Sequence, residues 1–204
     1  MRRIAIDDLL GSVEEIGRFA ARIALGGVAA VPTESFYALA ADPLSETGVR
    51  RVLEIKRRHD GKPLLVLFGA RRQLEPLGLA AAQEQLDALF RIWPAPLTAV
   101  VRLRGPVPAS LGQATLGVRL PAHDRLRELL ARTSALTGTS ANREGEEPCT
   151  RADEVASLLG AEIDVLVDGG RTPGGAPSTL VDMTSDPPRV LRAGAYPWPP
   201  PVGA

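Results

Sequence analysis

Lys56 and Lys62 are the only lysines in a chain that carries 22 arginines, and they stand seven residues apart inclusive, with Arg57 and Arg58 between them. An ammonium is a compact point charge, whereas a guanidinium is a broad planar fork. Four cations this close repel one another, and an anion such as a nucleotide triphosphate would relieve the repulsion. Residues 56–62, the basic segment, therefore predict a phosphate or carboxylate site, with a solvated charge run as the alternative.

Three further polar segments follow predicted strands, which is where open α/β sheets usually bind ligands. They are residues 32–39, 137–142 and 169–179. The first two are rich in hydroxyl groups, and the alternative for each is a turn stabilised by its own Ser, Thr or Asn side chains. The third contains four glycines and predicts either a backbone nest for anions or a flexible surface loop.

Arg119 and Arg192 each stand in an apolar run, where an arginine needs an acidic partner or an anionic ligand. The two histidines, His59 and His123, lack metal-ligand spacing, so no protein-held metal is predicted. Cys149 has no histidine near it in sequence, and no Gly-x-Ser-x-Gly motif occurs. This pattern favours catalysis by positioning and charge neutralisation, as in nucleotidyl transfer, over covalent catalysis.

Alternating helical and strand periodicities predict the elements that position these segments. Ser12 with Glu15 has capping-box spacing, and Thr150 with Asp153 marks a second helix start. The predicted helices are residues 12–25, 46–57, 83–92, 124–131 and 151–159. The predicted strands are residues 28–31, 64–68, 97–103, 116–120, 135–139, 163–168, 179–183 and 189–192. The alternation indicates the α/β class, with one domain, a largely buried mixed sheet and flanking helices.

The bulk composition limits the classes of function. The chain has 204 residues, 45% of them hydrophobic, which fits one domain with a proper core. Its 24 basic and 24 acidic residues cancel, so no global field favours nucleic acid and any anion site must be local. No apolar run reaches membrane-spanning length and the start does not resemble a secretion signal, so we expect a cytoplasmic protein without membrane contact.

The ordered motifs resemble the YrdC/TsaC (Sua-type) family of L-threonylcarbamoyladenylate synthases over about residues 12–195. The matching motifs are Pro32-Thr33-Glu34-Ser35-x-Tyr37, Lys56-x-Arg58 with Lys62-Pro63-Leu64, Trp93-Pro94-x-Pro96-Leu97-Thr98, Val118-Arg119-x-Pro121, Ser140-Ala141-Asn142, Pro177-Ser178-Thr179-x-Val181-Asp182 and Leu191-Arg192-x-Gly194. Each motif alone is weak, but seven in the family's order are specific. The resemblance implies a YrdC-like domain over residues 1–195 with a twisted sheet and a central ligand cavity, followed by a Pro-rich tail over residues 196–204.

The resemblance also implies a reaction of L-threonine, bicarbonate and ATP that gives L-threonylcarbamoyl-AMP and pyrophosphate for threonylcarbamoyladenosine in tRNA. Mg²⁺ would accompany ATP, held mostly by phosphates and water, and a tRNA-modifying threonylcarbamoyl transferase would be a transient partner. Lys56 and Arg58 would be catalytic. The implied ATP-binding residues are Lys56, Arg58, Lys62, Thr115, Asn142, Thr150 and Arg192. The implied threonine-binding residues are Ser35, Arg119, Ser140 and Ser178.

Several positions depart from the family pattern and leave alternatives open. Ala38 replaces the usual Gly, Ser35 the usual Thr, His59 a common Pro, Glu144 the usual Ser, and Leu67 a His of some members. A divergent paralogue that handles carbamoyl-adenylate instead of threonine is one alternative. The hydroxyl of Ser35, together with Arg119 and Ser178, favours an amino-acid substrate over it. A YrdC-like module that binds RNA without chemistry is another, and the zero net charge argues that RNA binding is weak or absent.

Overall fold

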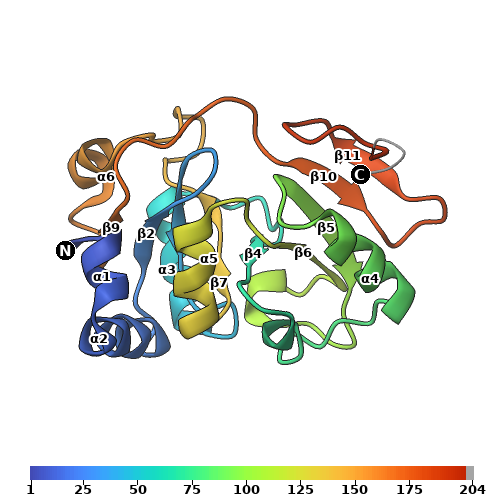
Figure 1. Ribbon diagram of the computed structural model, residues 1–204, viewed down its shortest axis with the longest axis horizontal. Coiled ribbons are helices and arrows are strands. Elements are labelled where there is room, and N and C mark those ends of the chain that lie inside the picture. The colour runs from blue at the N-terminus through green and yellow to red at the C-terminus, as the bar shows by residue number, and fades with distance from the viewer. Residues whose placement is uncertain (201–204) are drawn as a thin grey trace.

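A computed structural model describes residues 1–200 as an α/β domain with two sheets and flanking helices (Figure 1). The helices are α1 (Ile6–Gly11), α2 (Val13–Ala24), α3 (Glu46–Lys56), α4 (Gln83–Ile92), α5 (Asp124–Arg132) and α6 (Ala152–Leu159), with 3-10 turns η1 (Arg71–Leu74) and η2 (Pro108–Ser110). The strands are β1 (Arg2–Ala5), β2 (Ala29–Pro32), β3 (Tyr37–Ala40), β4 (Val66–Leu67), β5 (Leu97–Arg102), β6 (Thr115–Arg119), β7 (Leu136–Thr137), β8 (Thr139–Ser140), β9 (Val165–Asp168), β10 (Thr179–Asp182) and β11 (Arg189–Arg192).

The strands form two mixed sheets rather than the one sheet that the sequence predicts. The first sheet has the order β1-β9-β2-β3-β8, and the second has the order β11-β10-β5-β6-β4-β7. In the first sheet β9 runs parallel to β1 and β2, whereas β3 is antiparallel to β2 and β8. The chain changes sheets at Gly138, between β7 and β8, inside the single strand predicted at residues 135–139. A side chain at Gly138 would collide with Leu67 at 2.4 Å.

Strands β2 and β3 of the first sheet are buried along their whole length, whereas the edge strand β1 is largely exposed. In β2, Ala29 and Val31 face one hydrophobic cluster and Ala30 faces the other, as the two-residue period of a strand requires. Helices α1, α2 and α5 supply apolar residues to the first of these clusters, and α3 and α6 supply them to the second. The continuous apolar sequence of β2 therefore reflects two helical layers, in agreement with the predicted buried sheet.

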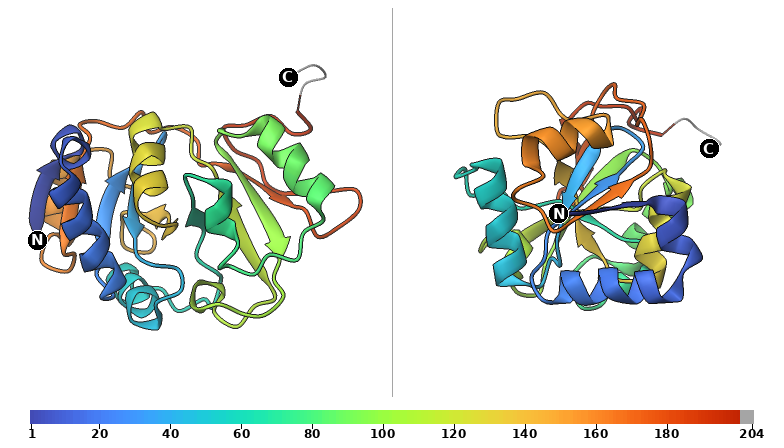
Figure 2. Two further views of the ribbon diagram at one scale, coloured as in Figure 1. Left: turned by 60° about the horizontal axis from the view of Figure 1, so that its bottom comes forward. Right: turned by 90° about the vertical axis from the view of Figure 1, so that its left-hand side faces the viewer.

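The second sheet extends from the middle of the molecule, where β7 lies beside α5, to the end opposite α1 and α2, where α4 lies beside it (Figures 1 and 2). Phe68, Phe90 and Trp93 pack edge to face here, with ring centroids 5.3–5.9 Å apart. Tyr196 and Trp198 also pack against the core, and the Thr179 hydroxyl donates to the Tyr196 carbonyl. The described part of the predicted tail is thus attached to the fold, and residues 201–204 lie outside the described residues.

The structure confirms most predicted elements and corrects their ends. Ser12 caps α2, because its hydroxyl accepts from the Glu15 amide at 3.2 Å. Helix α6 begins at Ala152, one residue later than the predicted range 151–159. The Glu154 carboxylate accepts from the Thr150 amide at 2.7 Å and from the Arg151 amide at 3.1 Å. The sequence analysis does not predict β1, α1 or β3, and it does not separate β8 from β7. None of the helices within residues 1–200 has the length and apolar composition needed to cross a bilayer.

Candidate functional site

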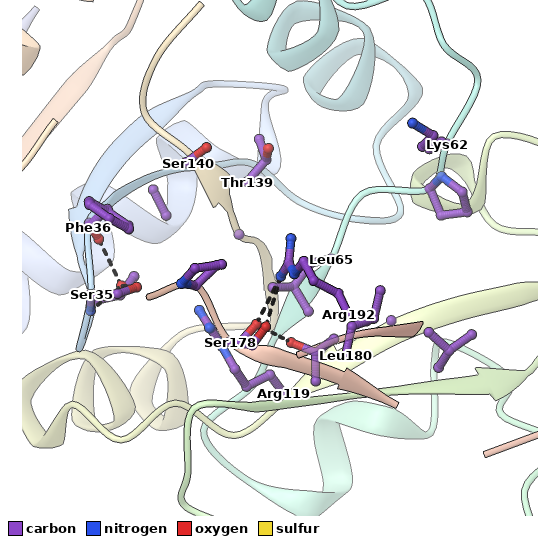
Figure 3. A pocket seen from close by; sticks show the side chains of 18 of the residues that line it. Ser35, Phe36, Lys62, Leu65, Arg119, Thr139, Ser140, Ser178, Leu180 and Arg192 are labelled. Atoms are coloured by element: carbon purple, nitrogen blue, oxygen red, sulfur yellow. Dashed lines mark hydrogen bonds between the residues drawn. The ribbon is translucent and has the colours of Figure 1, made fainter. Parts of the chain in front are cut away.

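A cavity of about 470 Å³ is lined by strands of both sheets (Figure 3). The first sheet contributes residues of β3 and β8, and the second contributes residues of β5, β6, β10 and β11. Four cations line the cavity, namely Arg58, Lys62, Arg119 and Arg192, and no acidic residue of residues 1–200 does. Such a wall favours anionic ligands, because convergent cations lower the cost of bringing negative charges together.

The turn between β2 and β3 brings Ser35 to the cavity. The Thr33 hydroxyl donates to the Phe36 carbonyl at 2.7 Å and accepts from the Ser35 amide at 3.2 Å. Residues 33–36 therefore form a turn stabilised by its own hydroxyl side chain, which is the alternative that the sequence leaves open for this segment. Ser35 nevertheless lines the cavity, so the turn and a ligand site coexist.

The glycines of the segment 169–179 form hydrogen bonds with this turn and do not line the cavity. The Tyr37 hydroxyl donates to the Gly170 carbonyl at 2.7 Å, and the Gly174 amide donates to the Ser35 carbonyl at 2.7 Å. Burial raises the pKa of Tyr37 to about 12, so its hydroxyl stays protonated at neutral pH. Of the predicted segment 169–179, Pro177 and Ser178 reach the cavity and its four glycines do not.

The basic segment is organised around Asp60. Its Oδ1 atom accepts from Arg58 Nε at 2.6 Å and from the Lys62 amide at 3.1 Å, and Oδ2 lies 3.0 Å from Lys62 Nζ. These donors hold the pKa of the Asp60 carboxyl well below its usual range, against the opposing effect of desolvation. Arg58 also donates to the Lys62 carbonyl at 2.7 Å. Arg58 and Lys62 are thereby held together at the cavity wall.

Lys56 lies apart from this pair and does not line the cavity. Its ammonium is buried and donates to the Ser140 carbonyl at 2.8 Å, and to the Asn142 carbonyl and side-chain oxygen at 3.0 Å each. Burial, assisted by the charge of Arg58, lowers the pKa of Lys56 to about 8, while Glu144 opposes the shift. Lys56 therefore fixes the segment that presents Ser140 to the cavity.

The far wall of the cavity carries Arg119, Ser178 and Arg192 (Figure 3). The Ser178 and Thr98 hydroxyls are 2.8 Å apart, and Arg192 donates to the Ser178 carbonyl at 2.9 Å. Arg119 is buried, with Nη1 3.3 Å from Glu34 Oε1. Burial lowers the pKa of both guanidinium groups, and the charge of Arg192 lowers that of Arg119 further.

The structure brings eight of the predicted site residues to one cavity: Ser35, Arg58, Lys62, Thr115, Arg119, Ser140, Ser178 and Arg192. Lys56 and Asn142 lie behind the Ser140 segment, and Thr150 lines a separate pocket with Cys149. Glu34, the acid beside Arg119, is not among the predicted site residues and does not itself line the cavity. The signal for it was the requirement of a buried arginine for an acidic partner.

The departures from the family pattern fall in different environments. Leu67 is fully buried in the core and does not line the cavity, whereas Ala38 does. His59 and Glu144 are exposed. Glu144 donates its amide to the Lys56 carbonyl at 2.9 Å, so its backbone is part of the structure that holds Lys56.

Fold and site together define an α/β domain with a cation-lined cavity for small anionic ligands. A family model for Sua5, YciO and YrdC proteins, described as "Telomere recombination", matches residues 21–194. The chain belongs to this family.

Two curated relatives are each 37% identical to the chain and are both named threonylcarbamoyl-AMP synthase. The protein from Pyrococcus abyssi aligns over 90% of this chain and 56% of its own length, and that from Thiobacillus denitrificans over 82% and 89%. The crystal structure of P. abyssi Sua5 complexed with L-threonine has a TM-score of 0.83 and 34% identity, covering 96% of this chain and 57% of that one. The chain thus spans just over half of the Pyrococcus protein.

Proposed function

We propose that the chain is an L-threonylcarbamoyladenylate synthase, a nucleotidyltransferase that forms L-threonylcarbamoyl-AMP and pyrophosphate from L-threonine, bicarbonate and ATP. One observation carries the proposal. A cavity lined by four cations and several hydroxyl groups lies in a chain 37% identical to two threonylcarbamoyl-AMP synthases. The P. abyssi relative in complex with L-threonine supports the choice of amino acid.

The proposed chemistry explains the need for convergent cations. The threonine nitrogen attacks the bicarbonate carbon, water leaves, and a carbamate forms. A carbamate oxygen then attacks the α-phosphorus of ATP, and pyrophosphate leaves. Each step brings anions together, so positioning and charge stabilisation supply the catalysis. Negative charge grows on the departing pyrophosphate, where nearby cations are most effective.

Within this proposal, different residues of the cavity bind L-threonine and the nucleotide. Arg119 binds the threonine carboxylate, because a guanidinium fork matches a carboxylate. The hydroxyls of Ser35, Ser140 and Ser178 supply further hydrogen bonds to the amino acid. The proposed nucleotide-binding residues at the cavity are Arg58, Lys62, Thr115 and Arg192.

The remaining predicted residues act from behind the cavity. Lys56 positions the Ser140–Asn142 segment through three hydrogen bonds. Its direct contact with phosphate stays a prediction, as do the nucleotide contacts of Asn142 and Thr150. Arg58 remains the proposed catalytic residue that touches the reacting anions, since it lines the cavity.

The proposal includes Mg²⁺ that arrives with ATP. No carboxylate of the described residues lines the cavity, and no group of three or more His, Cys, Asp or Glu side chains in residues 1–200 is placed to hold a metal. The ion would be held by phosphate oxygens and water, as Mg²⁺ commonly is. The proposal includes a cytoplasmic location and a tRNA-modifying threonylcarbamoyl transferase that consumes the product.

The decisive measurement is pyrophosphate release by the purified protein with ATP, bicarbonate and Mg²⁺. We expect release only when L-threonine is added, together with a product of the mass of threonylcarbamoyl-AMP. Release that is independent of threonine contradicts the proposal and favours carbamoyl-adenylate chemistry. RNA binding at physiological salt, measured by gel shift, separates the RNA-module alternative, because tight and salt-sensitive binding would support that alternative.

A further inference from the structure

The ion pair of Glu34 and Arg119 is almost fully buried and poorly hydrogen-bonded. The exposed side-chain fractions are 11% for Glu34 and 5% for Arg119, and the closest approach is 3.3 Å. Neither carboxylate oxygen of Glu34 accepts an aligned hydrogen bond, and Arg119 Nε has no acceptor. Within residues 1–200 these are the buried side-chain polar atoms without a hydrogen-bond partner. Buried polar groups normally have such partners, so this pair requires an explanation.

The local structure forces the two side chains together. Thr33 closes the turn of residues 33–36, which leaves Glu34 at its tip. Arg119 is the last residue of β6, and its carbonyl accepts from the Phe68 amide at 3.1 Å. Burial and the nearby charge of Arg192 both disfavour the charged form of Arg119, whereas the charge of Glu34 favours it. Glu34 is thus the counter-ion of a buried arginine that lies near a second arginine.

The geometry leaves most of the Arg119 donors for another anion. A guanidinium has five N–H donors, and Glu34 makes one long contact with one end of it. Arg119 lines the cavity but Glu34 does not. A ligand carboxylate in the cavity therefore meets the guanidinium on a different side from Glu34, so the two anions do not need the same donor.

We propose that Glu34 is a positioning residue, whose carboxylate holds the Arg119 guanidinium in the orientation that receives the carboxylate of the amino-acid substrate. The inference rests on the proposed function for the identity of that substrate. Glu34 touches no substrate itself, and its effect is transmitted through Arg119.

The test compares Glu34→Ala and Glu34→Gln with the wild-type protein. For Glu34→Ala we expect the KM for L-threonine to rise about tenfold, the effect of losing one charge-assisted contact. The KM for ATP stays within about twofold, because the nucleotide-side cations are untouched. Glu34→Gln gives a smaller rise, since its amide oxygen keeps a partial negative charge at the position that lies 3.3 Å from Arg119 Nη1 in the wild-type protein. It keeps the shape of the side chain and carries the test if Glu34→Ala does not fold.

A ligand pair isolates the carboxylate contact. L-threoninol has a hydroxymethyl group in place of the carboxylate of L-threonine, and calorimetry gives the affinity of each. We expect the wild-type preference for L-threonine to fall in both Glu34 variants. Glu162→Gln is the matched control, because it alters a partly buried ion pair with Arg143, 2.8 Å long, outside the cavity. It leaves the preference unchanged.

The outcomes separate this inference from the proposed function. If the variants lose thermal stability but keep the wild-type KM and ligand preference, Glu34 is merely structural and the inference is wrong. Tighter binding of L-threonine by Glu34→Ala also overturns it, because Glu34 would then compete with substrate. The proposed function is tested separately, by threonine-dependent turnover of the wild-type protein, and does not depend on the Glu34 variants. A wild-type protein that does not bind L-threonine overturns both.

Discussion

Lys56 and Lys62 are close in sequence but serve different purposes in the structure. Lys62 lies at the cavity wall with 77% of its side chain exposed, whereas Lys56 is 6% exposed. An ammonium has three donors in tetrahedral directions, and Lys56 uses all three on oxygens of Ser140 and Asn142. A planar guanidinium would not fit these acceptors in the same way. The need for a lysine in this arginine-rich chain is thus explained most directly at Lys56.

Replacing Lys56 by Ala tests this role. We expect the free energy of unfolding to fall by roughly 3 kcal/mol, because buried oxygens lose their donor. Pyrophosphate release is lost as well, since the Ser140 segment is no longer fixed. Urea denaturation and the release assay measure the two effects. Lys62→Ala is the control, with stability within about 0.5 kcal/mol of wild type because the side chain is exposed. Unchanged stability in Lys56→Ala would contradict the positioning role.

The sequence predicts a partner or ligand for Arg119 and Arg192 because each stands in an apolar run, and both line the cavity. Only Arg119 is buried, whereas β11, which contains Arg192, is exposed along its length. Glu34 was missed because its direction depends on the dihedral angles of the turn and on the position of β6. Thr150 illustrates the same limit, since the resemblance assigns it to the nucleotide, whereas in the structure it lines a separate pocket.

At the scale of elements, the basic segment is a loop held by its own carboxylate. Helix α3 ends at Lys56, and Arg57 adopts a left-handed conformation with φ of 54°. Asp60 then joins Arg58 and Lys62 through contacts of 2.6 and 3.0 Å. An exposed lysine held this way has lost rotamer freedom before any ligand arrives, which lowers the entropy cost of binding.

Changing Asp60 tests whether the loop is preorganised for phosphate. We expect Asp60→Ala to raise the KM for ATP by about three- to tenfold, because both cations lose their anchor. Asp60→Asn has a smaller effect, since one side-chain oxygen remains. The KM for L-threonine serves as an internal control and stays constant. A lower KM for ATP in either variant would instead show that Asp60 competes with phosphate.

The elements themselves were predictable where the pattern was long. The predicted helices at residues 46–57 and 83–92 agree with the structure almost to the residue, because the apolar periodicity is long enough there. β7 and β8 have two residues each, too short for a periodic signal, and Gly138 between them moves the chain from one sheet to the other. β3 gives no strand signal in the sequence, because its four residues are all buried and do not alternate between apolar and polar. It also follows the polar turn directly, so its start is not marked.

At the scale of the molecule, the cavity exists only when both sheets are in place. Its walls come from strands of each sheet, and the segment between β9 and β10 crosses from one sheet to the other (Figure 1). That segment is tied to the first sheet by the Tyr37–Gly170 hydrogen bond of 2.7 Å. Site geometry therefore depends on global folding, and conditions that weaken the fold also weaken the site.

His123 makes this global stability depend on pH. Its Nδ1 atom accepts from the Leu126 amide at 3.1 Å and so caps α5. Protonation removes this acceptor. Burial lowers the pKa of His123 below 6.5, and the charge of Arg127 lowers it further. The charges of Glu34 and Asp124 oppose this shift. The folded state therefore binds this proton less readily than the unfolded state.

The sign of the effect follows from proton linkage. Between the lowered folded pKa and the unfolded value of 6.5, the unfolded chain binds more protons, so stability rises with pH and is lost as pH falls from 7 toward 5. In His123→Asn the amide oxygen keeps the cap at every pH, and we expect this part of the pH dependence to disappear. His123→Ala loses the cap throughout, at a cost of about 1 kcal/mol at pH 7. Urea denaturation of the three proteins at pH 5, 6 and 7 measures the difference. Parallel curves for the wild-type protein and His123→Asn would show that His123 does not couple protons to folding.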